Sequence, residues 1–122
     1  LLRAYRTGEK AAGVGFDWPT LEGPKAKVLE EWQEIQEAIT AEKETKEVAG
    51  EIGDMLFALV NYSRHLGIDP ESALRETIDR FHRRFRHIER TLQEQGTLIR
   101  DTPIDSLNHL WEDAKSIEGE IS

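Results

Sequence analysis

Two acidic clusters contain the residues best suited to chemistry. The first is Glu30-Glu31-Trp32-Gln33-Glu34 and the second is Glu51-Ile52-Gly53-Asp54. In each cluster carboxylates recur one helical turn apart, so side chains from one helix can converge on a single point. Clusters that offer only oxygen donors suit hard divalent cations such as Mg²⁺. The spacing therefore favours metal-assisted phosphate chemistry.

The direction of each carboxylate around its helix separates the candidates. At roughly 100° per residue, Glu31 and Glu34 lie at the edge of an apolar stripe, whereas Glu30 points further toward solvent. Glu51 and Asp54 flank the stripe of the next helix in the same way. Four carboxylates at the core boundary of neighbouring helices would raise each other's pKa unless a cation or a basic group neutralised them.

A solvated helix face is the competing interpretation of these acids. Glu is a good helix former, and acidic residues on amphipathic helices are mostly exposed. This explanation is sufficient for Glu30 and Glu37 taken singly. For the four acids at the stripe edges, geometry alone leaves both a metal site and a solvated face open.

Basic and aromatic residues occupy comparable positions in the second half of the chain. Arg80 and Arg84 flank an apolar stripe, and guanidinium groups at a core edge suit bidentate recognition of phosphate. Trp111 has the spacing of a core residue, and Lys115 one turn later is a surface residue by default. The sequence contains no Gly-rich phosphate loop and no serine-hydrolase or zinc-helix motif. Phosphate chemistry would therefore depend on carboxylates and metals carried by helices.

Four amphipathic helices account for most of the sequence, and a short helix could precede them over residues 2–12. We expect Gly67 and Gly96 to end the second and third helices, and Asp69 to cap the third. The expected ranges are Pro24–Ala41, Lys46–Leu66, Pro70 to just before Gly96, and Thr102-Pro103 onward. The predicted fold is an all-α bundle of four main helices.

Each predicted helix carries an apolar stripe that we expect to be buried between helices or across a dimer interface. The stripes consist of Val28, Trp32, Ile35 and Ile39; Val48, Ile52, Met55, Leu56, Leu59 and Val60; Leu74, Ile78, Phe81, Phe85, Ile88 and Leu92; and Ile104, Leu107, Leu110, Trp111 and Ala114.

Composition limits the class of protein. The 122 residues suffice for one compact domain over residues 1–122, and the formal net charge of −8 argues against nucleic-acid or membrane partners. The absence of Cys excludes disulfides and thiolate metal sites. No apolar run approaches the roughly 20 residues that span a bilayer, and no signal-peptide core is present, so we expect a cytoplasmic protein. Since the chain does not begin with Met, we also consider it a possible piece of a longer protein.

The order of these motifs resembles a known family, the MazG-type nucleoside triphosphate pyrophosphohydrolase domains of the all-α pyrophosphatase superfamily. The resemblance covers nearly the whole chain. It rests on Gly15-Phe16-Asp17-Trp18-Pro19, the run from Lys27 to Glu34, the run from Glu51 to Asn61, Arg64-His65-Leu66-Gly67, the run from Arg80 to Phe85, and Trp111 with Lys115.

The resemblance implies hydrolysis of nucleoside triphosphates, ribo or deoxy, between the α and β phosphates, as part of nucleotide-pool house-cleaning. It also implies a compact homodimer and a requirement for Mg²⁺, for which Mn²⁺ could substitute. The implied metal ligands are Glu31, Glu34, Glu51 and Asp54. The implied phosphate contacts are Lys27, Arg80, Arg84 and Lys115, and Trp111 would contact the nucleotide. Glu30 and Glu34 are both candidates for the general base.

Two features qualify this interpretation. The family often has Lys at the position of Arg80, and Arg keeps the charge but changes the donor geometry.

The alternative function is a non-catalytic helical dimer that binds a nucleotide or acts as a regulatory interaction module. Such a module would tolerate loss of the acidic set, and all four carboxylates are present here. The sequence therefore favours the enzyme.

Overall fold

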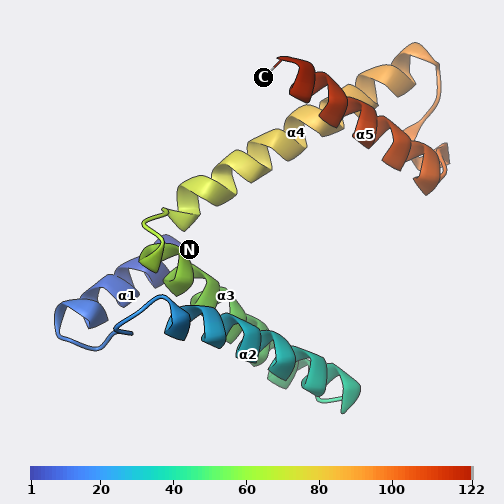
Figure 1. Cartoon of the computed structure of the whole chain (residues 1–122). Coiled ribbons are helices and arrows are strands. Elements are labelled where there is room, and N and C mark those ends of the chain that lie inside the picture. Colours follow the sequence, from blue (N-terminus) through green and yellow to red (C-terminus); the bar gives the residue numbers. More distant parts are fainter. Residues whose placement is uncertain (122) are drawn as a thin grey trace. The chain divides into compact units, whose positions relative to one another are not determined.

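The computed structural model describes the backbone of residues 1–121 and the side chains of residues 1–119. Within this range the chain is all-helical and contains no strand, which confirms the predicted fold class. The elements are α1 (Leu2–Gly13), α2 (Glu22–Thr40), α3 (Thr45–His65), α4 (Pro70–Glu94), the short 3₁₀ helix η1 (Ile99–Asp101) and α5 (Ile104–Ile121) (Figure 1). None of the helices in the described part of the chain is long and apolar enough to cross a membrane.

Capping residues begin and end the helices at the expected positions. Asp69 Oδ1 accepts a hydrogen bond from the backbone N–H of Glu71 at 3.0 Å, and Asp69 Oδ2 accepts one from the Ser72 hydroxyl at 2.9 Å. Gly67 and Gly96 have φ of +73° and +69°, the left-handed conformation that ends a helix at little cost for glycine. These local signals explain why the predicted helix boundaries agree with the structure to within about two residues.

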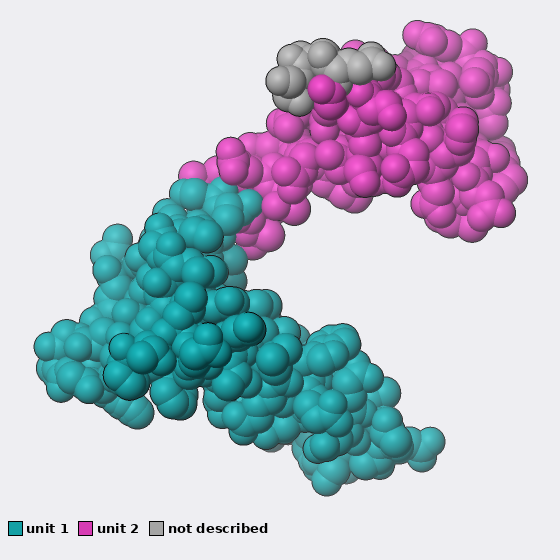
Figure 2. Space-filling model, in the orientation of Figure 1, with its two compact units in different colours: residues 1–73 teal, residues 74–122 magenta. Residues whose placement is uncertain are grey.

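The chain divides into two compact units, residues 1–73 and residues 74–122 (Figure 2). Unit 1 contains α1, α2, α3 and the first turn of α4. Unit 2 contains the rest of α4 with η1 and α5. The single domain that we expected over residues 1–122 stays a prediction, because compact units can be parts of one domain.

Unit 1 is built on the pair α2 and α3, with α1 packed against α3 (Figure 1). Its buried apolar side chains include Pro24, Ile35 and Ala38 from α2 and Ala58 and Val60 from α3. Small residues at this seam let the two helices approach closely. The same seam also carries a charged side chain, Glu31, which is only 4% exposed.

Unit 2 is a helical hairpin in which α5 packs on α4. Ile88 and Leu92 of α4 and Ala114 of α5 are buried. The rings of Phe81 and Trp111 meet with their centroids 5.2 Å apart. The unit therefore has its own small apolar core.

Much of the apolar surface that we expected to be buried is exposed. Of the predicted core residues in α4, only Ile88 and Leu92 are buried, while Phe81 is 52% exposed. The other predicted core residues that are exposed are Trp32, Ile39, Ile52, Leu56, Leu59, Leu74, Ile78, Phe85 and Ile104. Each unit is only two or three helices thick, so most helices have a partner on one side alone. The described part of the single chain leaves these positions exposed, so their burial between helices or across a dimer interface stays a prediction.

Candidate active site

Three carboxylates converge in unit 1. Glu31 comes from α2, and Glu51 and Asp54 come from α3. One oxygen from each side chain lies within 4.8 Å of the others. Glu31 is buried, Glu51 is half-buried and Asp54 is exposed. The cluster thus extends from the helix seam to solvent, so a ligand can approach it from outside.

The local fold explains this convergence. Glu31 lies one turn before the buried Ile35, so it shares the face of α2 that packs on α3. Glu51 and Asp54 lie one turn apart on α3, and Asp54 is one turn before the buried Ala58. Packing of the two apolar faces therefore brings the acidic side chains together.

Two oxygens in this cluster are buried without a hydrogen-bond partner, Glu31 Oε2 and Glu51 Oε2. Leaving a buried polar atom unsatisfied costs about 1–3 kcal/mol, and more for a charged group. A divalent cation would satisfy both atoms, and an oxygen-only donor set is the kind that Mg²⁺ prefers. The arrangement fits a metal ion by its chemistry as well as by its spacing.

Glu34 lies beside the cluster, but it is not among the three residues whose oxygens group within 4.8 Å. A hydrogen bond with Glu51 and the negative charge of Glu31 raise the pKa of Glu34 from 4.5 to about 7. This is the mutual effect that we expected of crowded acids. Near neutral pH, both protonation states of Glu34 are therefore populated.

Lys27 supplies a positive charge at the same place. Its Nζ lies 3.0 Å from Glu31 Oε1 and 3.5 Å from Glu30 Oε2. The hydrogen bond to Glu31 raises the pKa of Lys27, so this side chain remains cationic. Glu30 is exposed, as its angular position predicts, and pairs with Lys27 outside the carboxylate cluster.

The remaining predicted site residues lie in unit 2. The Arg84 guanidinium carbon is 5.3 Å from the centroid of the Trp111 ring. Arg84 Nε donates a hydrogen bond to Glu118 Oε2 at 3.0 Å, and Arg83 Nε lies 3.6 Å from Glu118 Oε1. Arg84 and Trp111 are therefore brought together, with a carboxylate of α5 already bound to the arginine.

Arg80 and Lys115 interact instead with neighbours on their own helices. Arg80 Nη2 donates to Thr77 Oγ1 at 3.4 Å, and Lys115 Nζ is 3.8 Å from Glu112 Oε2. Both side chains are exposed, so these contacts are weak. Either cation could turn to an anionic ligand at little cost.

An ionic cluster to which the sequence analysis assigned no role joins the loop before α2 to the end of α3. Asp17 Oδ1 accepts a hydrogen bond from Arg64 Nη2 at 2.6 Å and lies 2.8 Å from His65 Nε2. Arg64 Nη2 also donates to Asn61 Oδ1 at 2.9 Å. The hydrogen bond from Arg64 lowers the pKa of Asp17 to about 2. Arg64 and His65 in the last turn of α3 are visible in the sequence as candidates for an ionic contact. Their partner could not be predicted, because Asp17 lies 47 residues before Arg64.

A pocket of 1060 Å³ opens in unit 1 between α1, the loop before α2, and α3. Lys27, Glu31 and Asp54 belong to its lining, which places the acidic cluster at this opening. The aromatic side chains of Phe16, Trp18 and Phe57 belong to it as well, together with Asn61 and Arg64. The pocket therefore combines charged groups with a large apolar surface.

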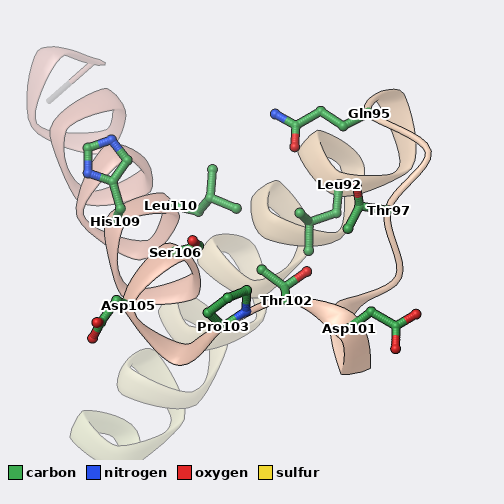
Figure 3. A pocket seen from close by; sticks show the side chains of 10 residues that line it. All are labelled: Leu92, Gln95, Thr97, Asp101, Thr102, Pro103, Asp105, Ser106, His109 and Leu110. Atoms are coloured by element: carbon green, nitrogen blue, oxygen red, sulfur yellow. The ribbon is translucent and has the colours of Figure 1, made fainter.

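A second hollow, of 510 Å³, lies in unit 2 where α4 turns through η1 into α5 (Figure 3). Its acidic side chains, Asp101 and Asp105, lie on opposite sides of the hollow. Leu92 and Leu110 supply apolar lining. Because its charged groups do not converge, this hollow does not resemble a metal or phosphate site.

The family model that matches the chain is the MazG nucleotide pyrophosphohydrolase domain, over residues 20–89. This match covers more than half of the chain and includes both acidic clusters. The chain belongs to the MazG family. The family assignment made from the sequence motifs is thus confirmed.

Two curated relatives match nearly the whole chain, and a third matches about half of it. It is 43% identical over 115 residues to the nucleoside triphosphate pyrophosphohydrolase/pyrophosphatase MazG of Thermotoga maritima, covering 94% of this chain and 44% of the relative. It is 38% identical over 119 residues to the nucleoside triphosphate pyrophosphohydrolase of Escherichia coli, covering 97% of this chain and 45% of the relative. An uncharacterized protein of Bacillus subtilis, YabN, is 47% identical over 68 residues, which are 56% of this chain and 14% of YabN. The chain thus spans less than half the length of the curated relatives it matches.

Proposed function

We propose that this chain hydrolyses nucleoside triphosphates between the α and β phosphates, releasing a nucleoside monophosphate and pyrophosphate. The main support is the convergence of Glu31, Glu51 and Asp54, two of which have buried oxygens without partners. The relatives of Thermotoga maritima and Escherichia coli are both named nucleoside triphosphate pyrophosphohydrolases, which supports the same reaction.

Mg²⁺ is the cofactor that we propose, with Mn²⁺ as a substitute. Glu31, Glu51 and Asp54 would hold it, and Glu34 is the proposed fourth ligand because it adjoins Glu31 and Glu51. Bound there, the ion would supply positive charge to the phosphates and increase the acidity of water. The oxygen-only donor set supports this choice over a softer metal.

The chain's own groups have separate tasks in this proposal. Lys27 remains cationic beside Glu31 and can bind a phosphate oxygen by turning from its carboxylate partners. Glu34 is a candidate general base because a pKa of about 7 lets it accept a proton at neutral pH. Glu30 is the other candidate, since it is exposed and pairs only loosely with Lys27. Replacing each acid by its amide, in separate variants, distinguishes them.

Unit 2 supplies further phosphate contacts in the proposal, namely Arg80, Arg84 and Lys115, and Trp111 as a nucleotide contact. The ion pair of Arg84 with Glu118 supports this role, because the arginine already binds an oxyanion. A phosphate oxygen would take the place of that carboxylate. The guanidinium also lies over the Trp111 ring in a cation–π contact.

We also propose that the chain works as a homodimer. Leu74, Ile78, Phe81 and Phe85 are exposed and recur on one face of α4, which makes a continuous apolar strip. Monomeric proteins rarely expose contiguous apolar patches beyond a few hundred Å². A second copy of the chain could cover this strip.

The proposed reaction is tested by incubating the purified chain with Mg²⁺ and a panel of ribo- and deoxynucleoside triphosphates. Equal amounts of monophosphate and pyrophosphate are the expected products, and excess chelator should stop their release. Orthophosphate as the sole phosphate product, or turnover that survives thorough chelation, would contradict the proposal. Tight nucleotide binding without any turnover would instead indicate a non-catalytic nucleotide-binding module.

A further inference from the structure

The pocket of unit 1 has an aromatic wall that the proposed reaction does not explain. Phe16 is 72% exposed, Trp18 is 46% exposed and Phe57 is 47% exposed, although all three line the pocket. Keeping three large rings in contact with water is unfavourable. Aromatic faces of this kind bind flat ligands, because a nucleobase can stack on them.

This wall adjoins the carboxylate cluster along α3. Asp54, Phe57, Asn61 and Arg64 all line the pocket and recur at helical spacing, so they lie along one face of that helix. Asn61 is seven positions after Asp54, which corresponds to an axial distance of about 10 Å along the helix. A nucleoside whose phosphates are bound at Asp54 can extend over this distance toward Asn61.

The loop that carries two of the rings is held by an ionic contact. Asp17 stands between Phe16 and Trp18 in the sequence, and its carboxylate binds Arg64 and His65 at the end of α3. Asp17 Oδ1 also accepts a hydrogen bond from the backbone N–H of Trp18 at 2.9 Å. The loop is therefore fastened to α3 at the residue between its two aromatic side chains.

A close approach at Gly23 fixes the position of Trp18 independently. A Cβ added to Gly23 would lie 2.6 Å from a carbon of the Trp18 indole ring, closer than real Cβ contacts allow. The indole therefore lies directly against the backbone of the first turn of α2, where only glycine leaves room for it. A Cβ added to Gly50 in α3 would meet no atom within 4 Å, so Gly50→Ala is a matched control for Gly23→Ala.

We propose that this pocket binds the nucleoside of the triphosphate, with the base against Phe16, Trp18 and Phe57. This assignment rests on the proposed function, since the acidic end of the pocket would hold the phosphates. Asn61 faces the base as a polar group. Its amide oxygen accepts hydrogen bonds from Arg64 Nε at 3.2 Å and Nη2 at 2.9 Å, which orients the amide nitrogen as a donor.

The test compares ligands with and without a nucleoside. The probes are a triphosphate analogue with a methylene group between the α and β phosphorus atoms, and inorganic tripolyphosphate, both with Mg²⁺. Calorimetry should find that Phe16→Ala and Trp18→Ala each bind the analogue with about tenfold lower affinity than wild type. This loss is within the range for one stacked base. Affinity for tripolyphosphate should stay within twofold of wild type, because that ligand does not reach the aromatic wall.

A comparison of Gly23→Ala with Gly50→Ala distinguishes displacement of the Trp18 indole from a general loss of helix stability. Gly23→Ala should reduce the affinity for the analogue as much as Trp18→Ala does, whereas Gly50→Ala should bind the analogue as tightly as wild type. Circular dichroism checks folding, and Phe16→Ala keeps the test valid if Gly23→Ala fails to fold, because the Phe16 side chain is mostly exposed.

Two results would overturn the pocket assignment. One is unchanged affinity for the analogue in both Phe16→Ala and Trp18→Ala. The other is an equal loss for the analogue and tripolyphosphate, which would mean that the rings support only the phosphate site. Release of pyrophosphate by the wild-type chain is measured separately, so a failure of the proposed reaction is recognised independently of the binding result.

Discussion

The two units differ in how their charged side chains are paired. In unit 1, carboxylates of like sign gather at the seam of α2 and α3, and two of their oxygens have no hydrogen-bond partner. In unit 2, the guanidinium of Arg84 pairs with Glu118 and lies over the Trp111 ring. The first cluster leaves two buried carboxylate oxygens without a hydrogen-bond partner, whereas Arg84 of the second is paired within its own unit.

This difference indicates which cluster needs a ligand for its stability. Like charges in a shared site repel, and a hydrogen bond with Glu51 together with the negative charge of Glu31 raises the pKa of Glu34. An arginine that pairs with a carboxylate has no comparable need. A ligand that binds unit 1 should therefore stabilise it strongly, and one that binds Arg84 must first displace Glu118.

The largest effect is expected from removing a carboxylate of unit 1. Glu51→Ala or Asp54→Ala should reduce kcat/KM by about a thousandfold or more, because several kcal/mol of charge stabilisation depend on the bound metal. Folding should be preserved, since the change removes repulsion. Pyrophosphate release measures the loss, and Glu47→Ala on the exposed side of α3 is the control. Normal turnover in Glu51→Ala would remove the basis for assigning the metal site to unit 1.

The next effect concerns the internal ion pair of unit 2. Arg84→Ala should raise KM for triphosphates roughly tenfold, the size of a lost charge-assisted hydrogen bond. Glu118→Gln should lower KM by about twofold to fivefold, because it frees the guanidinium from a competing anion. Steady-state kinetics on both variants decide the matter. A KM that does not change in either variant would mean that this arginine has only a structural role.

The third prediction uses the pKa of Glu34. The folded-state pKa of about 7 exceeds the ordinary value of 4.5, so the metal-free protein should lose stability as the pH rises from 4.5 to about 7. Over the same interval Mg²⁺ affinity should increase, since the ion binds the ionised carboxylate. Thermal melts with chelator and with Mg²⁺ measure both trends. Glu34→Gln should reduce the pH dependence of both the stability and the Mg²⁺ affinity. An unchanged pH profile in that variant would exclude Glu34 as the group responsible.

The smallest effect is expected from the Asp17 contact. Asp17→Ala should lower Tm by a few degrees and leave Mg²⁺ affinity unchanged, because the ion pair joins a loop to the end of α3 away from the carboxylates. The depressed pKa means that the wild-type contribution is present above pH 3.8 and is lost as the pH falls through about 2. Glu9→Ala, an exposed change on α1, is the control. Equal melting temperatures for both variants would show that the contact adds no stability.

Several features of the fold and the site could be predicted from local sequence. Asp69, Gly67 and Gly96 mark helix ends by side-chain and backbone preferences that act within a few residues. Helical periodicity separated Glu31 from the more exposed Glu30, as the structure also does. Burial was predicted less well, because Leu74 and Ile78 have the pattern of core residues but are exposed in the described part of the chain.

The sequence by itself determined which side chains each helix presents on one face, because that depends only on 3.6 residues per turn. It thereby determined the acidic edges of α2 and α3 and the basic edge of α4. Only the tertiary structure decided that Glu31 meets Glu51 and Asp54 with two oxygens unpaired, since packing of separate helices sets those distances. The tertiary structure also decided that Asp17 binds Arg64 and that Trp18 lies against Gly23, because contacts between distant segments follow from how the chain packs and leave no periodic signal in the sequence.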